Sequence, residues 1–261
     1  MSRRVLVTGG RSGLGAALVR QLRAAGDRVL VTDLADRGPS VEVGDDYLRL
    51  DVRNLDDWLR AREWVEQRWG GLDLLVNNAG VAAGGRIDVA DVEEWQRVLD
   101  VNLLGVARGC HVFVPVMKRQ RSGHIVNVAS MAGLVYPPNM SSYNAAKAGV
   151  VALSETLLHE LEPFGIAVTV VCPSFFRTNL SGSLRGRDEE AQASARRLID
   201  GSRRSPEDVA RQVVAAVQHR RFLLITDRMG RAAYLGKRFA RPMYHRVMRT
   251  VSRSFARRTR R

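Results

Sequence analysis

The sequence predicts an α/β protein in which a Rossmann-type, doubly wound parallel sheet of seven strands carries helices on both faces. Three observations lead to this prediction. Short runs rich in Val, Leu and Ile recur along the chain, as is typical of strands buried on both sides. Segments with helical periodicity separate these runs. A glycine-rich turn lies between the first apolar run and the first helical segment.

The first half of the chain alternates regularly between strand and helix. A strand is expected over 3–9, and the helix that follows over 13–25 is ended by Gly26. The next strand is expected over 28–32. A further strand over 47–52, a helix over 55–69 and a strand over 72–76 complete this half.

The second half continues the alternation with longer helices. Helical patterns over 91–109 and 112–121 are compatible with one interrupted helix. Strands are expected over 124–128, 166–171 and 222–226, with helices over 142–163 and 206–219 between them. No repeat or low-complexity linker interrupts residues 1–227. We therefore expect one dinucleotide-binding domain over 1–227, followed by an extension over 228–261.

Composition excludes several classes of protein. Hydrophobic residues make up 45% of the 261 and charged residues 26%, which excludes disordered, fibrous and disulfide-framework chains. No run of about 18 apolar residues predicts a membrane-spanning helix. Cys110 and Cys172 are expected to be buried free thiols. The apolar run begins at Val5, too early for a secretory signal, so a cytoplasmic protein is expected.

The net charge of +14 belongs to the end of the chain. Residues 219–261 contain thirteen arginines and one lysine against a single acid, whereas residues 1–218 carry a net charge of only +1. Two amphipathic helices are expected here, over 228–240 and 242–257, because Pro242 suits a first helical turn. Their apolar stripes either pack on the domain or on a partner subunit, or lie on an anionic membrane surface. Nucleic acid is the less favoured partner, because the aromatic residues face away from the arginines.

The turn Thr8-Gly-Gly-Arg-Ser-Gly-Leu-Gly15 has the features of a pyrophosphate-binding site. Gly9 and Gly13 allow backbone torsions that a Cβ would block, and Gly15 lets the helix approach the sheet. The free N–H groups at the start of the helix favour an anion. Asp33, at the end of the second strand, can accept both ribose hydroxyls and would repel a 2′-phosphate. NAD is therefore preferred, although Arg11 and Arg37 leave NADP possible.

A set of polar residues in the second half is more specific. Tyr143 and Lys147 are four residues apart and so share one face of a helix. Ser130 ends a strand thirteen residues earlier. With Asn102, the segment Asn77-Asn-Ala-Gly80 and the glycine turn, this set resembles the short-chain dehydrogenase/reductase family over residues 3 to about 227. The sequence departs from the family pattern after the sixth strand, where Pro173-Ser174 replaces the usual Pro-Gly.

The resemblance implies an NAD(P)-dependent oxidoreductase acting on CH–OH groups. It implies that Tyr143 is the general acid/base, that Lys147 favours the phenolate and binds the nicotinamide ribose, and that Ser130 polarises the substrate oxygen. Asn102 would hold a water on the proton path. The resemblance and the turn together give these cofactor-binding residues: Gly9, Arg11, Ser12, Gly13, Leu14, Gly15, Asp33, Asp51, Val52, Asn77, Asn78, Ala79, Gly80, Tyr143, Lys147, Pro173 and Thr178. The five histidines show no metal-ligand spacing, so no metal is expected.

The expected pocket lies beyond the carboxyl ends of the strands. Its lining would come from 81–85, Met131, Val135, Tyr136, Met140 and a loop over 175–202. These mostly apolar walls favour a hydrophobic secondary alcohol or ketone, such as a steroid, a lipid or a xenobiotic. The alternative is a catalytically silent scaffold that binds the cofactor and uses its basic tail for a membrane or a partner. The resemblance also implies a homodimer or homotetramer paired through helices 103–121 and 142–163.

Overall fold

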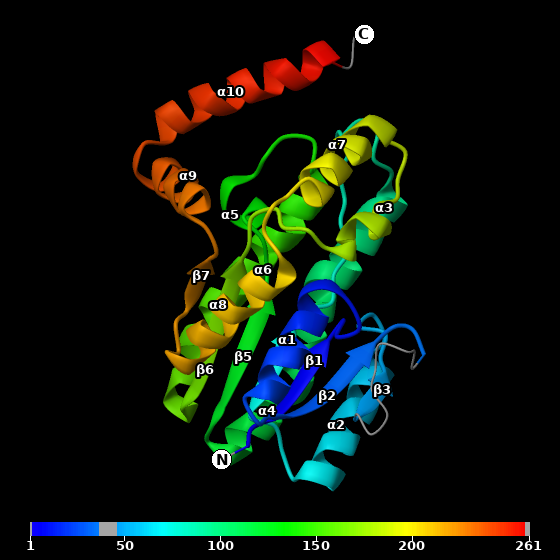
Figure 1. Cartoon of the computed structure of the whole chain (residues 1–261), viewed down its shortest axis with the longest axis vertical. Coiled ribbons are helices and arrows are strands. Elements are labelled where there is room, and N and C mark those ends of the chain that lie inside the picture. Colours follow the sequence, from blue (N-terminus) through cyan, green and yellow to red (C-terminus); the bar gives the residue numbers. More distant parts are fainter. Residues whose placement is uncertain (1, 37–45, 259–261) are drawn as a thin grey trace.

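A computed structural model describes residues 2–36 and 46–258 (Figure 1). The sheet has seven parallel strands in the order β3-β2-β1-β4-β5-β6-β7, which confirms the predicted fold class. The strands are β1 (Arg4–Thr8), β2 (Arg28–Asp33), β3 (Tyr47–Arg49), β4 (Leu74–Asn77), β5 (Gly123–Val128), β6 (Ile166–Cys172) and β7 (Leu223–Ile225). Because β1 pairs with both β2 and β4, the order reverses there and opens a crevice at the carboxyl edge.

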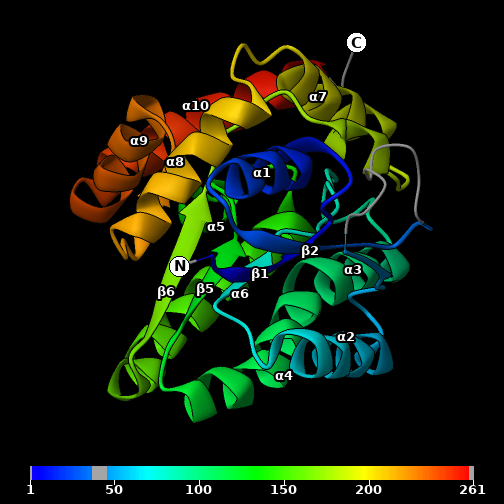
Figure 2. The same ribbon diagram turned by 60° about the horizontal axis from the view of Figure 1, so that its bottom comes forward.

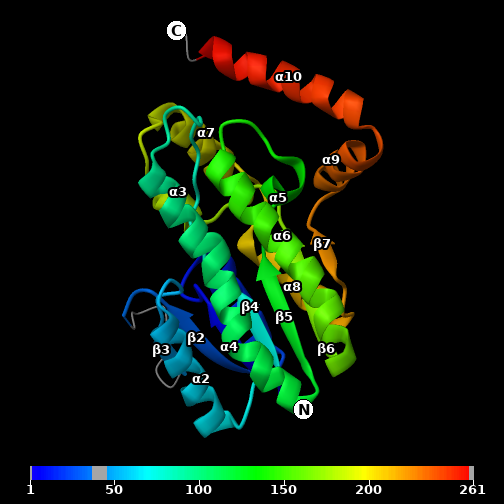
Figure 3. The same ribbon diagram turned by 180° about the vertical axis from the view of Figure 1, so that it is seen from behind.

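Helices cover both faces of the sheet (Figure 2). On one face, α1 (Gly13–Ala24) and α8 (Pro206–Gln218) pack together over the strands. On the other face lie α2 (Leu55–Trp69), α4 (Gly105–Gln120) and α6 (Ser141–Leu161), which are seen from the front in Figure 3. Trp58 and Phe113 meet edge to face between α2 and α4, with ring centroids 6.3 Å apart. The two hydrophobic layers hold the strand ends in a fixed register.

The two helical patterns expected over 91–109 and 112–121 form one continuous helix. It begins as α3 (Val92–Leu99), widens into a π-helical turn, η1 (Asp100–Leu104), and continues as α4. By length and hydropathy this segment could cross a membrane. However, Val106, Phe113 and Met117 are buried in the core against the sheet, so the segment is a core helix of this fold.

Two boundaries differ from the prediction for local reasons. The third strand ends at Arg49 rather than 52, because Asp51 starts a turn in which Asn54 N–H donates to its carbonyl. The helix α6 ends at Leu161, and Pro163 lies in a short 3₁₀ turn, η2 (Glu162–Phe164). Both cysteines are free and buried, as predicted.

The expected loop over 175–202 was wrong in one respect, because it contains a helix. After a 3₁₀ turn, η3 (Asn179–Ser183), the helix α7 (Glu189–Asp200) lies above the carboxyl edge of the sheet (Figure 1). Asp188 caps it by accepting a hydrogen bond from Ala191 N–H at 3.1 Å. Ala195 and Ile199, four residues apart, are buried. The N-cap followed by this spacing is the signal that could have predicted α7.

The basic extension forms two helices, α9 (Arg228–Phe239) and α10 (Arg241–Arg258), close to the predicted ranges. Asp227 caps α9 by accepting a hydrogen bond from Gly230 N–H at 2.7 Å. Of the alternatives left open for the apolar stripe, packing on the domain is not found for Leu235 and Phe239 of α9. Leu235 and Phe239 are exposed, whereas Lys237 faces a neighbouring short helix, α5 (Ala132–Val135). The reason is the cation–π contact of Lys237 with the Tyr136 ring. This contact places the Lys237 side of α9 against the domain and leaves the side with Leu235 and Phe239 in solvent.

Candidate active site

Tyr143 and Lys147 lie one turn apart on the buried face of α6, as the sequence predicts. Their exposed fractions are 9% and 4%, and the Lys147 ammonium lies 5.8 Å from the centre of the Tyr143 ring. Ala146 and Val150 are buried on the same face. The apolar spacing of these neighbours fixes the rotation of α6 and therefore aims both polar side chains inward.

Ser130 follows β5 at the carboxyl edge of the sheet. Its hydroxyl accepts a hydrogen bond from Ala132 N–H at 3.1 Å, and Met131 N–H donates to the Pro173 carbonyl at 2.9 Å. The first bond starts α5, and the second ties the end of β5 to the end of β6. Ser130 is therefore held close to Tyr143. A hydrogen bond between the two side chains lowers the pKa of the Tyr143 phenol.

Burial dominates the electrostatics of this pair. It raises the pKa of Tyr143 to about 12, with the Ser130 hydrogen bond acting in the opposite direction. Burial likewise lowers the pKa of Lys147 to about 8, although its ammonium donates to the Val128 carbonyl at 2.8 Å. Both shifts disfavour the charged form in a low-dielectric site. A phenolate at Tyr143 therefore needs a cation beside it.

Asn102 reaches the same edge from the π-helical turn η1. It is fully buried, and its amide makes two bonds of 2.9 Å with Val81, accepting from the N–H and donating to the carbonyl. Gly80 lies between Asn102 and Lys147. A Cβ at Gly80 would come 2.9 Å from the Asn102 Oδ1 and 3.7 Å from the Lys147 Nζ. These three residues are therefore neighbours, although they come from three elements.

The glycine turn forms the other half of the site. Gly9 and Gly13 adopt positive φ values of 63° and 51°, and a Cβ at Gly15 would lie 2.0 Å from the Gly9 carbonyl oxygen. This close approach brings the start of α1 against the turn. The turn is anchored by Thr8, whose hydroxyl accepts from the N–H groups of Asn78 and Ala79 at 3.0 Å each.

The two asparagines after β4 have structural contacts that the sequence did not reveal. The Asn78 side chain donates to the carbonyls of Thr8 and Gly9 at 2.9 and 3.2 Å, so it holds the turn in place. Asn77 is buried and donates to Asn127 Oδ1 at 2.9 Å. Its side chain lies among core residues. Ala79 borders the glycine turn, because a Cβ at Gly9 would come 3.0 Å from the Ala79 Cα.

The remaining cofactor candidates surround the turn. Ser12 is the exposed N-cap residue of α1, and Leu14 is buried in the core. The Asp33 carboxylate accepts hydrogen bonds from the N–H groups of Arg11 and Leu34 at 3.2 and 2.9 Å. It therefore faces the mouth of the turn. The Arg11 Nε is buried and finds no partner in the described part of the chain. Arg37 lies outside the described residues.

Three further cofactor candidates are Asp51, Val52 and Thr178. Asp51 binds Arg53 at 2.7 Å, which holds its pKa below the ordinary value, and Val52 is buried beneath it. Thr178 lies over the turn, because a Cβ at Gly13 would come 2.5 Å from its hydroxyl. The loop after β6 therefore closes on the glycine turn. A cradle lined by backbone N–H groups, glycines and the orphaned Arg11 Nε fits a nucleotide with a diphosphate.

The substrate side is covered by contacts that sequence reasoning missed. Ala82, Leu184, Ala195 and Ile199 form a buried apolar cluster between the segment after β4 and α7. Arg86 binds Asp188 at 2.8 Å, and Ala82 N–H donates to the Ser183 hydroxyl at 2.8 Å. These bonds join residues about a hundred positions apart. They fix α7 as an apolar cover over the site.

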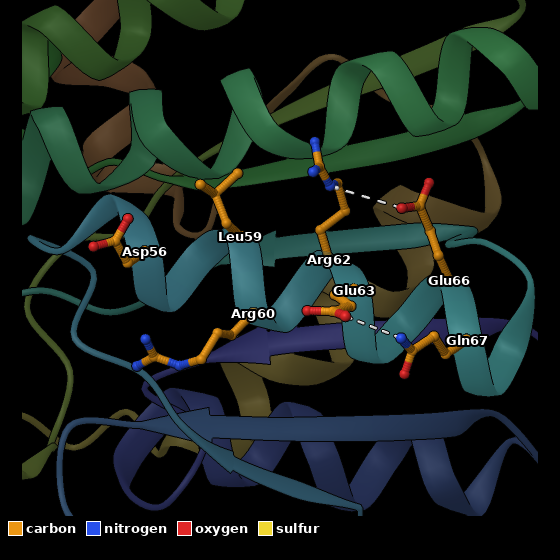
Figure 4. A pocket seen from close by; sticks show the side chains of 7 residues that line it. All are labelled: Asp56, Leu59, Arg60, Arg62, Glu63, Glu66 and Gln67. Atoms are coloured by element: carbon orange, nitrogen blue, oxygen red, sulfur yellow. Dashed lines mark hydrogen bonds and ion pairs between the residues drawn. The ribbon is translucent and has the colours of Figure 1, made fainter.

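A separate hollow on the outer face of α2 has a different character (Figure 4). It is lined by one helix alone, with Arg62 pairing with Glu66 and Glu63 with Gln67. None of the catalytic candidates lies in it. The catalytic candidates Ser130, Tyr143 and Lys147 all lie at the carboxyl edge of the sheet instead.

Comparison with known proteins identifies the family. The family model described as short chain dehydrogenase matches residues 3–189. The chain belongs to the short-chain dehydrogenase family. Membership confirms the resemblance and the oxidoreductase class expected from Ser130, Tyr143 and Lys147.

Relatives of this short-chain dehydrogenase include named dehydrogenases and a solved structure. It is 35% identical to trans-4-hydroxycyclohexanecarboxylate dehydrogenase of Sinomonas cyclohexanicum, over 72% of this chain and 80% of the relative. It is 37% identical to 3-alpha-(or 20-beta)-hydroxysteroid dehydrogenase of Mycobacterium bovis, over 67% and 70%. A short chain dehydrogenase/reductase of Burkholderia phymatum, solved in complex with NAD, superposes with a TM-score of 0.85 at 31% identity, covering 91% of this chain and 93% of that one.

Proposed function

We propose that this chain transfers a hydride between NAD and a hydrophobic secondary alcohol or ketone, with Tyr143 as general acid/base. The observation that carries the proposal is the burial of Tyr143 beside Ser130 and Lys147, at the edge where the glycine turn opens. The proposed catalytic unit is residues 1–227. A silent scaffold would not require these groups together in a low-dielectric site.

Each catalytic residue has a task that follows from its position. Tyr143 would give a proton to the carbonyl oxygen in reduction and take it from the alcohol in oxidation. Ser130 would donate a hydrogen bond to the same oxygen, and the Lys147 ammonium would favour the phenolate. Asn102 would hold a water on the path from Lys147 to solvent. When bound, the nicotinamide group supplies or accepts the hydride.

The Asp33 carboxylate supports NAD as the preferred cofactor. It faces the mouth of the turn, where it would accept the ribose hydroxyls and repel a 2′-phosphate. Thr178 would bind the nicotinamide amide, and Asp51 and Val52 the adenine. Arg11 keeps NADP possible, since its guanidinium has an Nε near the turn that finds no partner among the described residues. A related structure contains NAD, in agreement with this preference.

The apolar cluster beneath α7 supports a hydrophobic substrate. Ala82, Leu184 and Ile199 offer no charge to bind a polar or ionic substrate. Among the relatives, the hydroxysteroid dehydrogenase is named for a hydrophobic, ring-bearing alcohol. An alicyclic or steroid-like alcohol is therefore the class to test first, with lipid-like and xenobiotic ketones next.

The first experiment compares Tyr143→Phe with the wild type. A panel of alcohols and ketones is screened by nicotinamide absorbance, and the variant is then measured on each substrate found. We expect turnover to fall about 10²- to 10⁴-fold, because the proton donor is removed, with NADH affinity nearly unchanged. Tyr234→Phe is the matched control, since Tyr234 lies in α9. Wild-type rates in Tyr143→Phe would refute the mechanism.

A homodimer or homotetramer paired through α4 and α6 is the proposed assembly. The family resemblance carries this proposal, and a cytoplasmic location remains a prediction with it. Sedimentation of a monomer at micromolar concentration would contradict the assembly.

A further inference from the structure

The last two helices expose a row of apolar side chains. Leu235, Phe239, Met243 and Val247 follow one another at intervals of four residues across the junction of α9 and α10. Their exposed fractions are 49%, 78%, 64% and 53%, so each side chain is about half exposed or more. A row this exposed on a protein surface is typical of a binding surface.

Other side chains of these helices bind the domain. The Lys237 ammonium lies 3.1 Å from the centre of the Tyr136 ring and donates to the Leu134 carbonyl. The Tyr244 hydroxyl donates to the Val135 carbonyl. The helix α9 is thus tied to the segment after Ser130 by the side opposite Leu235 and Phe239. The helix α10 is tied to it by Tyr244, at the flank of the apolar row. This attachment holds the apolar row outward, so its exposure follows from how the tail is bound.

The same helices carry an unbalanced positive charge. Residues 228–261 contain eleven arginines and one lysine and no acid, while residues 1–218 are nearly neutral. Arg246, Arg249 and Arg253 are exposed on α10. In Figure 1, α10 extends past α7 at the end of the molecule opposite the N-terminus. The tail therefore presents apolar and cationic side chains together at one end.

We propose that α9 and α10 dock on the surface of an anionic phospholipid bilayer. A second copy of this tail would bring the same positive charge and no acid to meet it. Nucleic acid would satisfy the arginines but leave Leu235, Met243 and Val247 in water. An anionic bilayer supplies both acyl chains for the apolar row and phosphate and carboxylate groups for the arginines.

Docking would also affect access of the substrate to the site, and this part of the inference rests on the proposed function. The tail is tied to residues 134–136, which follow Ser130 and border the expected substrate side. A docked protein would hold this side near the bilayer, where hydrophobic alcohols and ketones concentrate. The docking itself needs no turnover, so it is tested separately from the reaction.

The test measures binding of the full chain to vesicles by co-sedimentation. Vesicles of phosphatidylcholine alone are compared with vesicles that also contain phosphatidylserine, over a series of salt concentrations. We expect binding to the anionic vesicles and release as salt rises. Arg246→Gln, Arg249→Gln and Arg253→Gln together should weaken binding about a hundredfold, at about fivefold for each arginine. Phe239→Ser with Met243→Ser should weaken it about tenfold or more.

Two controls separate docking from general effects of charge and hydrophobicity. Arg121→Gln, Arg196→Gln and Arg203→Gln remove the same charge from outside the tail and should leave binding nearly unchanged. Leu55→Ser with Val92→Ser removes apolar side chains that are 41% and 67% exposed elsewhere. Equal weakening by these controls would overturn the proposal. So would tighter binding of duplex DNA than of vesicles, or a dimer that ignores vesicles and dissociates in Phe239→Ser with Met243→Ser.

Discussion

Replacing Lys147 by Met should abolish turnover while stabilising the fold at neutral pH. The Lys147 side chain is 4% exposed, and the described residues offer it no carboxylate partner. Its ammonium has one hydrogen bond, to the Val128 carbonyl at 2.8 Å. Burial therefore lowers its pKa from 10.5 to about 8. The site keeps this buried cation at a cost in stability, as catalytic sites commonly do.

The magnitude follows from the pKa difference. Because the native pKa lies below that of the unfolded chain, the native state binds fewer protons between pH 8 and 10.5, and stability rises with pH across that window. Below pH 8 the full cost is present, about 3 kcal/mol at 1.36 kcal/mol for each pKa unit. Met removes this cost but leaves the Val128 carbonyl without its donor, a loss of about 1 kcal/mol. The variant should gain about 2 kcal/mol at pH 7.

Urea unfolding without cofactor measures this effect, since bound cofactor would add its own stabilisation. Wild-type stability should approach that of Lys147→Met by about 1 kcal/mol between pH 7 and 9. Lys118→Met is the control, because the Lys118 ammonium lies over the Phe164 ring near the surface, 4.3 Å from its centre. A Lys147→Met protein less stable than the wild type at pH 7 would refute the reasoning.

Two other predictions concern the cofactor and acid stability. NADH should bind at least about tenfold more tightly than NADPH in a fluorescence titration. Asp33→Asn should reduce this affinity ratio, whereas Asp36→Asn, which changes an exposed carboxylate, should leave the ratio unchanged. Equal affinities of the wild type for NADH and NADPH would mean that Arg11 outweighs the Asp33 carboxylate. His124 is buried, with its Nε2 2.8 Å from the Thr169 hydroxyl, and burial lowers its pKa to about 4. Because this native pKa lies below the unfolded value near 6.5, stability should fall by up to about 3 kcal/mol as the pH drops from 6.5 to 4. His124→Asn should lose that acid sensitivity in thermal unfolding, and an unchanged pH dependence would contradict the assignment.

The sequence by itself determined the features that local chain geometry controls. Alternating apolar runs and helical periods predict the seven strands, because burial on two faces leaves a direct pattern in the residues. Tyr143 and Lys147 are four positions apart, and the spacing of a helix alone places them on one face. The torsions of Gly9 and Gly13 are likewise a local property of the turn.

Only the tertiary structure decided how distant segments meet. Asn102 binds Val81 from a π-helical turn that no local sequence pattern predicts. The Asn78 side chain donates a hydrogen bond to the Thr8 carbonyl, a contact between residues seventy positions apart. The pairing of Arg86 with Asp188 depends on the position of α7 in the folded chain, because Asp188 caps that helix. The amphipathic pattern of the tail predicted its helices but not their rotation. That rotation is set by Lys237 on α9, whose contact with Tyr136 requires the folded domain to exist first.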